Sequence, residues 1–182
     1  MLRPRIIPCL LVQNKGLVKT VKFGNPKYVG DPLNAVRIFN EKESDELMVM
    51  DIDASREKRE PDYKMIEFWA SECRMPLCYG GGIKNAEQAL RIFSLGVEKV
   101  AISSAAIENP ELVTEIAQQV GSQSVVVVLD VKKKTFGGYE VYTCNGTKAT
   151  GKNPFDLAKK FEELGVGEIV INSIDHDGVM KG

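Results

Sequence analysis

The stretch from residue 76 to residue 106 constrains the fold most, because two short apolar segments flank one amphipathic helix pattern there. The first segment ends in three glycines, the helix pattern ends at Gly96, and the second segment follows directly. Two strands that are joined by a single helix run parallel, since an antiparallel pair needs only a short turn. The stretch therefore predicts one βαβ unit.

The ends of these two strands carry residues that suit an anion. Gly80, Gly81 and Gly82 follow the first strand, where bare backbone can approach a ligand closely and direct its N–H groups at a negative charge. Ser103 and Ser104 end the second strand and offer hydroxyl groups at the same edge. This arrangement predicts a phosphate cup, and a plain tight turn is the equally compatible alternative.

Composition places the chain among ordinary soluble domains. It has 182 residues, 43% apolar content and a net charge of −1, which gives no support to nucleic acid or a membrane as a partner. The N-terminal segment lacks the apolar stretch of a signal peptide, and Cys9 and Cys78 lie in apolar strands, so we expect reduced core thiols and a cytoplasmic location. With one histidine and no paired cysteines, neither a metal site nor another cofactor is predicted.

The remaining chain repeats the strand and helix alternation. Apolar segments of strand length span 5–12, 46–52, 125–129 and 168–173, and helices are predicted to begin near Asp31, Tyr63, Asn109 and Asn153. Two segments differ from this pattern. Residues 13–30 show no periodicity and carry four lysines, which predicts a mobile lid or a solvated loop, and residues 139–149 predict a hairpin around Asn145–Gly146.

The alternation predicts an α/β fold of the (β/α)₈ TIM-barrel family with about six βα units, and a doubly wound sheet is the rival. Segments 46–55 and 168–178 resemble one another, as two half-barrels would. We therefore expect one domain over 1–182, with a first half-barrel at 1–121 and a partial second half at 122–182. A closed barrel needs about 250 residues, so the C-terminal quarter with strands seven and eight is expected to be absent.

Several motifs give the chain a resemblance to a known family. They are Arg5-Ile-Ile-Pro-Cys-Leu, Asp51-Ile-Asp-Ala-Ser, Gly80-Gly-Gly-Ile, Asn109-Pro-Glu-Leu and Asp175-His-Asp-Gly, together with shorter matches between them. In this combination the sequence resembles the cyclase subunit of imidazole glycerol phosphate synthase, HisF. The resemblance implies a barrel that binds a ribonucleotide with two phosphates and receives ammonia from a HisH-like glutaminase docked on the amino-terminal face.

The resemblance also assigns roles at the carboxyl ends of the strands. It makes Asp130 a catalytic aspartate, Gly82, Ser103 and Ser104 one phosphate site, and Gly178 the start of the opposite one. The remaining matches are Lys19, at the lid lysine, and Asp51 and Asp177, at polar residues of the same mouth. Leu11 stands where the family has its second acid/base aspartate. Leucine cannot transfer a proton, and losing one acid/base group typically lowers the rate by about 10² to 10⁴.

At the opposite ends of the strands the family pattern is intact. Arg5, Glu46, Lys99 and Glu168 match a ring of alternating charges that gates the ammonia passage, and Asp45 and Glu98 would face the glutaminase. Four separate surface charges are the alternative. An intact gate beside a lost proton carrier resembles the HisF-like WbuZ-type proteins of sugar amidation in surface-polysaccharide (O-antigen) synthesis, which pass ammonia to a sugar amidotransferase.

Three functions follow as expectations. The first is an ammonia-relaying subunit of a glutamine-dependent amidotransferase. The second is a true cyclase of histidine biosynthesis, and the third is a non-catalytic barrel that binds a phosphorylated small molecule or a partner.

Overall fold

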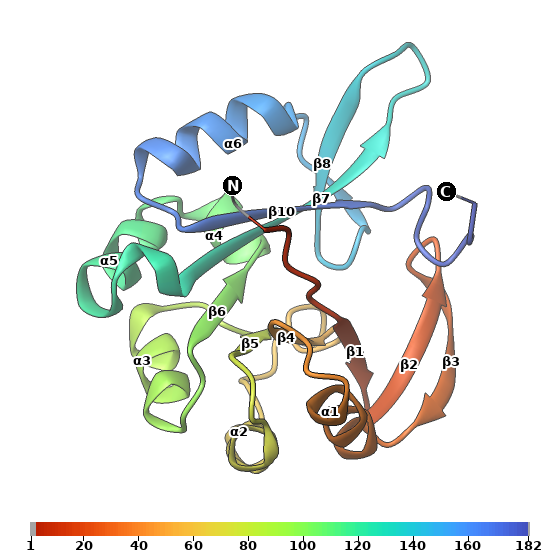
Figure 1. Cartoon of the computed structure of the whole chain (residues 1–182). Helices are drawn as coiled ribbons and strands as arrows, with labels where there is room; N and C mark the ends of the chain where they lie inside the picture. Colours follow the sequence, from red (N-terminus) through yellow and green to blue (C-terminus); the bar gives the residue numbers. More distant parts are fainter. Residues whose placement is uncertain (1–2, 182) are drawn as a thin grey trace.

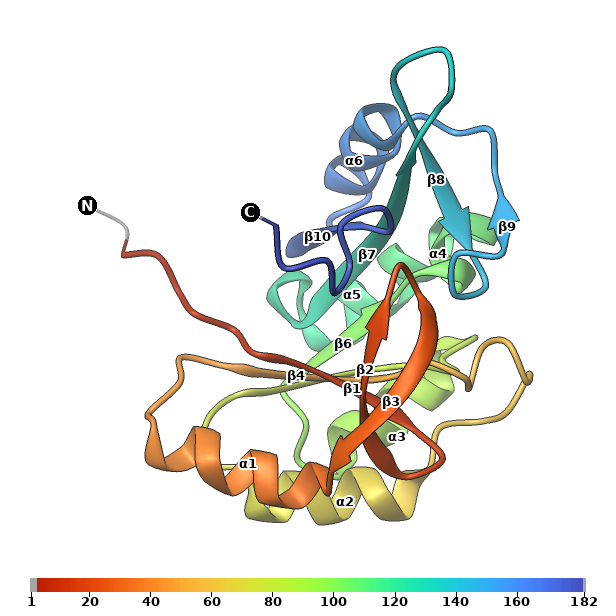
Figure 2. The same cartoon turned by 90° about the vertical axis from the view of Figure 1, so that its right-hand side faces the viewer.

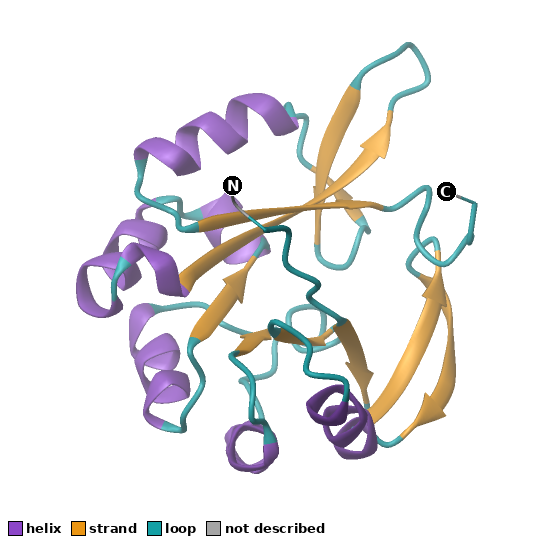
Figure 3. Ribbon diagram, viewed as in Figure 1, coloured by secondary structure: helices purple, strands orange, loops and turns teal. Residues whose placement is uncertain are grey.

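A curved parallel sheet with helices on its outer side forms the body of the protein (Figures 1 and 3). The computed structural model describes residues 3–181. Its parallel strands are β1 (Cys9–Gln13), β4 (Leu47–Asp51), β5 (Leu77–Gly80), β6 (Lys99–Ile102), β7 (Val125–Lys133) and β10 (Glu168–Ser173). Its helices are α1 (Pro32–Glu41), α2 (Tyr63–Glu72), α3 (Ala86–Ser94), α4 (Ser104–Glu108), α5 (Glu111–Val120), the 3₁₀ turn η1 (Ser122–Ser124) and α6 (Pro154–Glu163).

The strand order agrees with a barrel and not with a doubly wound sheet. Each parallel strand pairs with the next one along the chain, so the order never reverses as it does at a doubly wound switch point. The register is staggered as well. Leu11 of β1 pairs with Met50 of β4, and the pairing continues from strand to strand through Gly80, Ala101 and Val126. It ends at Glu168, the first residue of β10. Such a stagger is what strands that tilt around a barrel axis require.

Apolar side chains fill both sides of this sheet. A large cluster, which includes Leu47, Ile66 and Phe161, packs the strands against the helices. A smaller cluster of Met48, Cys78, Ala101, Val126 and Val128 lies inside the curve. Burial on both faces explains why the strands are continuously apolar. The inner cluster makes the inner side of the curved sheet apolar.

Two antiparallel hairpins stand beside the carboxyl ends of the strands (Figure 2). The first is β2 (Gly16–Val21) with β3 (Gly24–Gly30), so the expected irregular loop at 13–30 is wrong. Its turn uses left-handed backbone at Lys22 and Phe23, which carries no glycine signal. The second hairpin, β8 (Tyr139–Thr143) with β9 (Lys148–Ala149), confirms the prediction, and β8 also pairs with an extended β7.

The expectation for the thiols is half right. Cys78 is fully buried, whereas Cys9 is exposed. The inner face of the sheet explains this, because Cys9 lines the open cavity there, whereas Cys78 is packed within the inner cluster. None of the helices in residues 3–181 combines the length and apolar content needed to span a membrane.

Gly167 offers a test of how tightly β10 is set against its neighbours. A Cβ at this position would lie 2.2 Å from the Ser122 carbonyl oxygen, whereas at Gly24 the nearest atom would lie 3.5 Å away. Overpacking against backbone costs about 1–3 kcal/mol. Gly167→Ala should therefore lower the free energy of unfolding in urea by that amount, and the matched Gly24→Ala should change it by less than about 0.5 kcal/mol. Equal effects would contradict the close approach.

Candidate functional site

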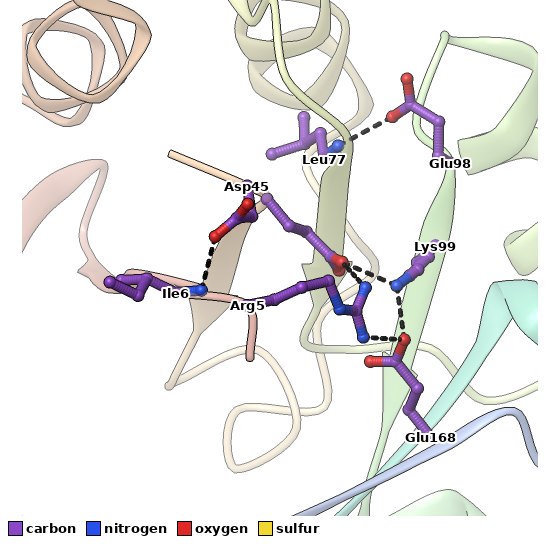
Figure 4. A network of polar contacts seen from close by, with 8 residues as sticks. Arg5, Ile6, Asp45, Leu77, Glu98, Lys99 and Glu168 are labelled. Carbon is purple, nitrogen blue, oxygen red and sulfur yellow. Dashed lines mark hydrogen bonds and ion pairs between the residues drawn. The ribbon is translucent and has the colours of Figure 1, made fainter. Parts of the chain in front are cut away.

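Four charged side chains close a ring at the amino-terminal ends of the strands, here called the floor ring (Figure 4). Arg5 contacts Glu46 at 2.9 Å and Glu168 at 2.6 Å, and Lys99 contacts the same two carboxylates at 2.7 Å each. Each cation bridges both anions, and the four residues come from four different parts of the chain. The alternative of four unrelated surface charges is therefore wrong.

Because the ring is partly buried, each of its charges depends on the opposite charges for compensation. The Glu46 side chain is 2% exposed and Lys99 13%, while Arg5 is 48% exposed and forms the outer side of the ring. Burial alone would raise the pKa of Glu168, but hydrogen bonds from Lys99 and Arg5 bring it below its ordinary value. Two carboxylates can lie this close only because both cations neutralise them. The ion pairs of the ring thus allow charged side chains to lie at the base of an apolar interior.

Asp45 and Glu98 lie beside the ring and bind backbone. Asp45 accepts a hydrogen bond from the Ile6 N–H at 2.7 Å, and Glu98 accepts one from the Leu77 N–H at 2.8 Å (Figure 4). These bonds fix the segment before β1 and the start of β5.

One cavity of about 480 Å³ extends from Glu168 of the floor ring to the opposite ends of the strands. Its lining includes Glu168 at the floor, Cys9, Met48 and Val170 in the middle, and Asp130 at the other end. We call the end that contains Asp130 the mouth. The lining between floor and mouth is mostly apolar, so a small neutral molecule could cross it without a charged group to hold it.

Asp130 occupies the mouth in a form suited to proton transfer. It lies on β7, and its Oδ1 accepts a hydrogen bond from the Asn172 side chain of β10 at 3.2 Å. Burial raises the pKa of Asp130 to about 6, with a further contribution from the charge of Asp177. A carboxyl group with a pKa near the working pH can both donate and accept a proton. Leu11 lines the same cavity and offers only methyl groups.

The residues of the predicted phosphate cup lie on one cavity. Gly82, Ser103 and Ser104 all line the cavity. Among the described residues the buried Ser103 hydroxyl has no hydrogen-bond partner, while the Ser104 hydroxyl accepts from the Cys144 N–H at 3.0 Å. The Gly82 N–H reaches only a long 3.4 Å contact with Ser55. The Ser103 hydroxyl and the Gly82 N–H are thus two donors on this cavity that have no strong hydrogen-bond partner among the described residues.

The other predicted mouth residues have structural partners. Asp51 accepts from the N–H groups of Asp53 and Ala54 and pairs with Arg59 at 3.3 Å, which holds the turn after β4. Lys19 is exposed on β2, and it is not among the residues that line the cavity.

Asp177 and Gly178 hold the first hairpin over the mouth. Asp177 accepts from the Thr20 hydroxyl at 2.8 Å and from the Phe23 N–H at 2.9 Å. Gly178, with φ +65°, lies so close to Thr20 that a Cβ would meet its carbonyl oxygen at 2.0 Å. Asp177 and Phe23 line the cavity, so the hairpin tip forms part of its wall.

Sequence reasoning missed Asn172, which orients Asp130. A signal was available, because Asn172 is a polar residue near the end of an otherwise apolar strand segment. It also missed Thr20 and Phe23, whose role depends on a partner more than 150 positions away.

The fold and the site define a class of protein: a barrel-type chain with an ionic floor, a mostly apolar cavity and a carboxyl group of raised pKa at its mouth. The sequence profile described as "Histidine biosynthesis protein" matches residues 5–182. The chain is 63% identical, over 100% of its length and 70% of the relative, to the "Putative imidazole glycerol phosphate synthase subunit hisF3" of Vibrio vulnificus. It is 41% identical, over 100% of its length and 72% of the relative, to the "Imidazole glycerol phosphate synthase subunit HisF" of Alkaliphilus metalliredigens.

A third relative, from Leptospira interrogans, is named "Putative imidazole glycerol phosphate synthase subunit HisF" and is 64% identical to the chain. The match covers 100% of the chain and 72% of that protein. The chain belongs to the HisF family of imidazole glycerol phosphate synthase subunits.

The floor ring predicts a measurable stability effect. Glu46→Gln removes the buried anion that both cations share, and breaking such a pair leaves uncompensated charge. We expect the free energy of unfolding to fall by about 2–3 kcal/mol. The matched variant Glu108→Gln, whose pair with Lys148 is exposed on both sides, should lose less than about 0.5 kcal/mol. Similar losses in urea titrations of both variants would show that the ring does not act as a unit.

Asp130 predicts a pH-dependent stability. Because its pKa is raised to about 6 in the folded chain, the stability linked to its protonated form is fully present below the unfolded pKa of about 3.9 and is lost as the pH rises through 6. Asp130→Asn removes this term. Between pH 4 and pH 7 the unfolding free energy of the wild type should fall relative to the variant by up to about 3 kcal/mol. Parallel pH profiles for the two proteins would contradict the raised pKa.

Proposed function

We propose that this chain is the ammonia-accepting, cyclase-type subunit of a glutamine-dependent complex of the imidazole glycerol phosphate synthase type. One observation carries the proposal: Glu168 of the floor ring and Asp130 line the same cavity, so the groups needed at the two ends of such a reaction face one internal space. Ammonia would be delivered at the floor and used at the mouth.

The floor ring supports the first half of this route. Its four contacts lie at the amino-terminal ends of the strands, where ammonia would enter, and separation of an ion pair would open a way past them. Arg5 is the most exposed member and precedes β1, in a segment where the Ile6 N–H donates a hydrogen bond to the Asp45 carboxylate. A glutaminase docked over Arg5, Asp45 and Glu98 would contact this part of the ring directly and could control its opening.

The mouth supports the second half. The free Ser103 hydroxyl, with Ser104 and the Gly82 N–H, would bind a phosphate of the substrate, which places the rest of that molecule across the cavity toward Asp130. Asp130 would then act as the general acid and base during attack by ammonia and ring closure, with Asn172 keeping the carboxyl group in place.

The names of the relatives favour cyclisation in histidine biosynthesis over the sugar amidation expected from the sequence. Sugar amidation, with a sugar amidotransferase as a further partner, therefore becomes the second candidate. Leu11 is the observation in its favour. It lines the cavity where a second proton carrier would be needed, and a barrel without that group could still pass ammonia to another enzyme.

Turnover with ammonium salt and the phosphoribosyl-formimino ribonucleotide tests the cyclase. We expect formation of imidazole glycerol phosphate, a loss of about 10² to 10⁴ in kcat for Asp130→Asn, and a gain for Leu11→Asp. The variant Asp156→Asn, on the surface of α6, controls for general effects of removing a carboxylate.

Absence of turnover in both the wild type and Leu11→Asp would overturn the cyclase. Glutamate release by an added HisH-type glutaminase then separates the remaining functions. Stimulated release would support the ammonia relay, and no stimulation would leave a barrel that only binds phosphate or a partner.

A further inference from the structure

The β7–β8 ribbon carries a lysine on the same face as the catalytic candidate. Side chains alternate along a strand, so Lys132, two residues after Asp130, points to the face on which Asp130 lies. Asp130 pairs with Tyr142 and Lys132 pairs with Glu140, which places these four residues on one side of the ribbon. Lys133 lies on the opposite side.

The Lys132 ammonium group lies near the ring of Tyr142 and forms no ion pair with its cross-strand neighbour Glu140, and both Lys132 and Tyr142 lie outside the set of residues that line the cavity. Its Nζ lies 5.7 Å from the centre of the Tyr142 ring, and Tyr142 is the residue paired with Asp130. Glu140 instead accepts a hydrogen bond from the Gly151 N–H. Within residues 3–181 no carboxylate lies within 4.0 Å of Lys132, so the charge is available to a ligand.

The position fits an anionic group at the outer edge of the cavity. Asn145 from the β8–β9 turn lines the cavity, which shows that the ribbon borders the mouth. A flexible ammonium group resting on an aromatic face keeps its hydrogen-bond donors free for a phosphate or carboxylate.

We propose that Lys132 is a ligand-binding residue that holds an anionic group of the molecule bound at the mouth, with Tyr142 positioning its ammonium group. The proposal rests on the proposed function in that the mouth binds a phosphorylated ligand. It adds a cationic contact beside Asp130 that is separate from the phosphate cup of Gly82, Ser103 and Ser104.

Calorimetric titration with the phosphoribosyl-formimino ribonucleotide tests this residue. Lys132→Gln should weaken binding about fivefold, Lys132→Arg should restore most of the loss, and the adjacent Lys133→Gln should bind as the wild type does. Added salt should weaken binding to the wild type more than to Lys132→Gln, because one charge contact is then missing.

Lysine footprinting gives a second, independent measurement. Reductive methylation followed by mass spectrometry should show that the bound ribonucleotide protects Lys132 and leaves Lys133 reactive. Equal affinities of Lys132→Gln and Lys133→Gln, or equal reactivity of Lys132 with and without ligand, would overturn the inference. A wild type that binds no ribonucleotide would instead overturn the proposed function.

Discussion

Charge neutralisation at the floor of the barrel is the interaction on which the rest of the structure depends. Glu46 and Glu168 lie close to one another at the base of an apolar interior, and either carboxylate alone would be costly to bury there. Lys99 and Arg5 remove that cost by bridging both. Since Arg5 reaches the ring from the segment before β1 and Glu168 begins β10, the ring also ties the first and last parallel strands of the described residues together.

The carboxylates at the two ends of the cavity differ in whether a cation pairs with them. At the floor every charge is paired, so the site is neutral and closed. At the mouth Asp130 is buried with no cation within ion-pair distance among the described residues, and burial raises its pKa although the hydrogen bond from Asn172 opposes the rise. A paired carboxylate holds structure, and an unpaired one can exchange protons. The same residue type therefore has different roles at the two ends because the surroundings differ.

Much of the fold could be predicted from local signals. Asp31 and Asn153 precede prolines and cap α1 and α6 through bonds to the N–H groups of Leu33 and Phe155, as the N-cap rules require. The continuously apolar strands and the end of α5 before Gly121 could be predicted in the same way. These features depend on neighbours within a few residues, so the sequence contains nearly all the information needed to place them.

The β2–β3 hairpin could not be predicted in this way. Its turn places Lys22 and Phe23 in left-handed backbone, which neither residue favours by itself. The conformation is held from outside, by the Asp177 carboxylate on Thr20 and Phe23 and by the Asp177 carbonyl on the Lys22 N–H at 2.9 Å. The floor ring shows the same limit: strand starts reveal four charges, but only the barrel stagger brings them into contact. Local patterns thus place the strands and helices, while the residues that shape the site depend on contacts between distant segments.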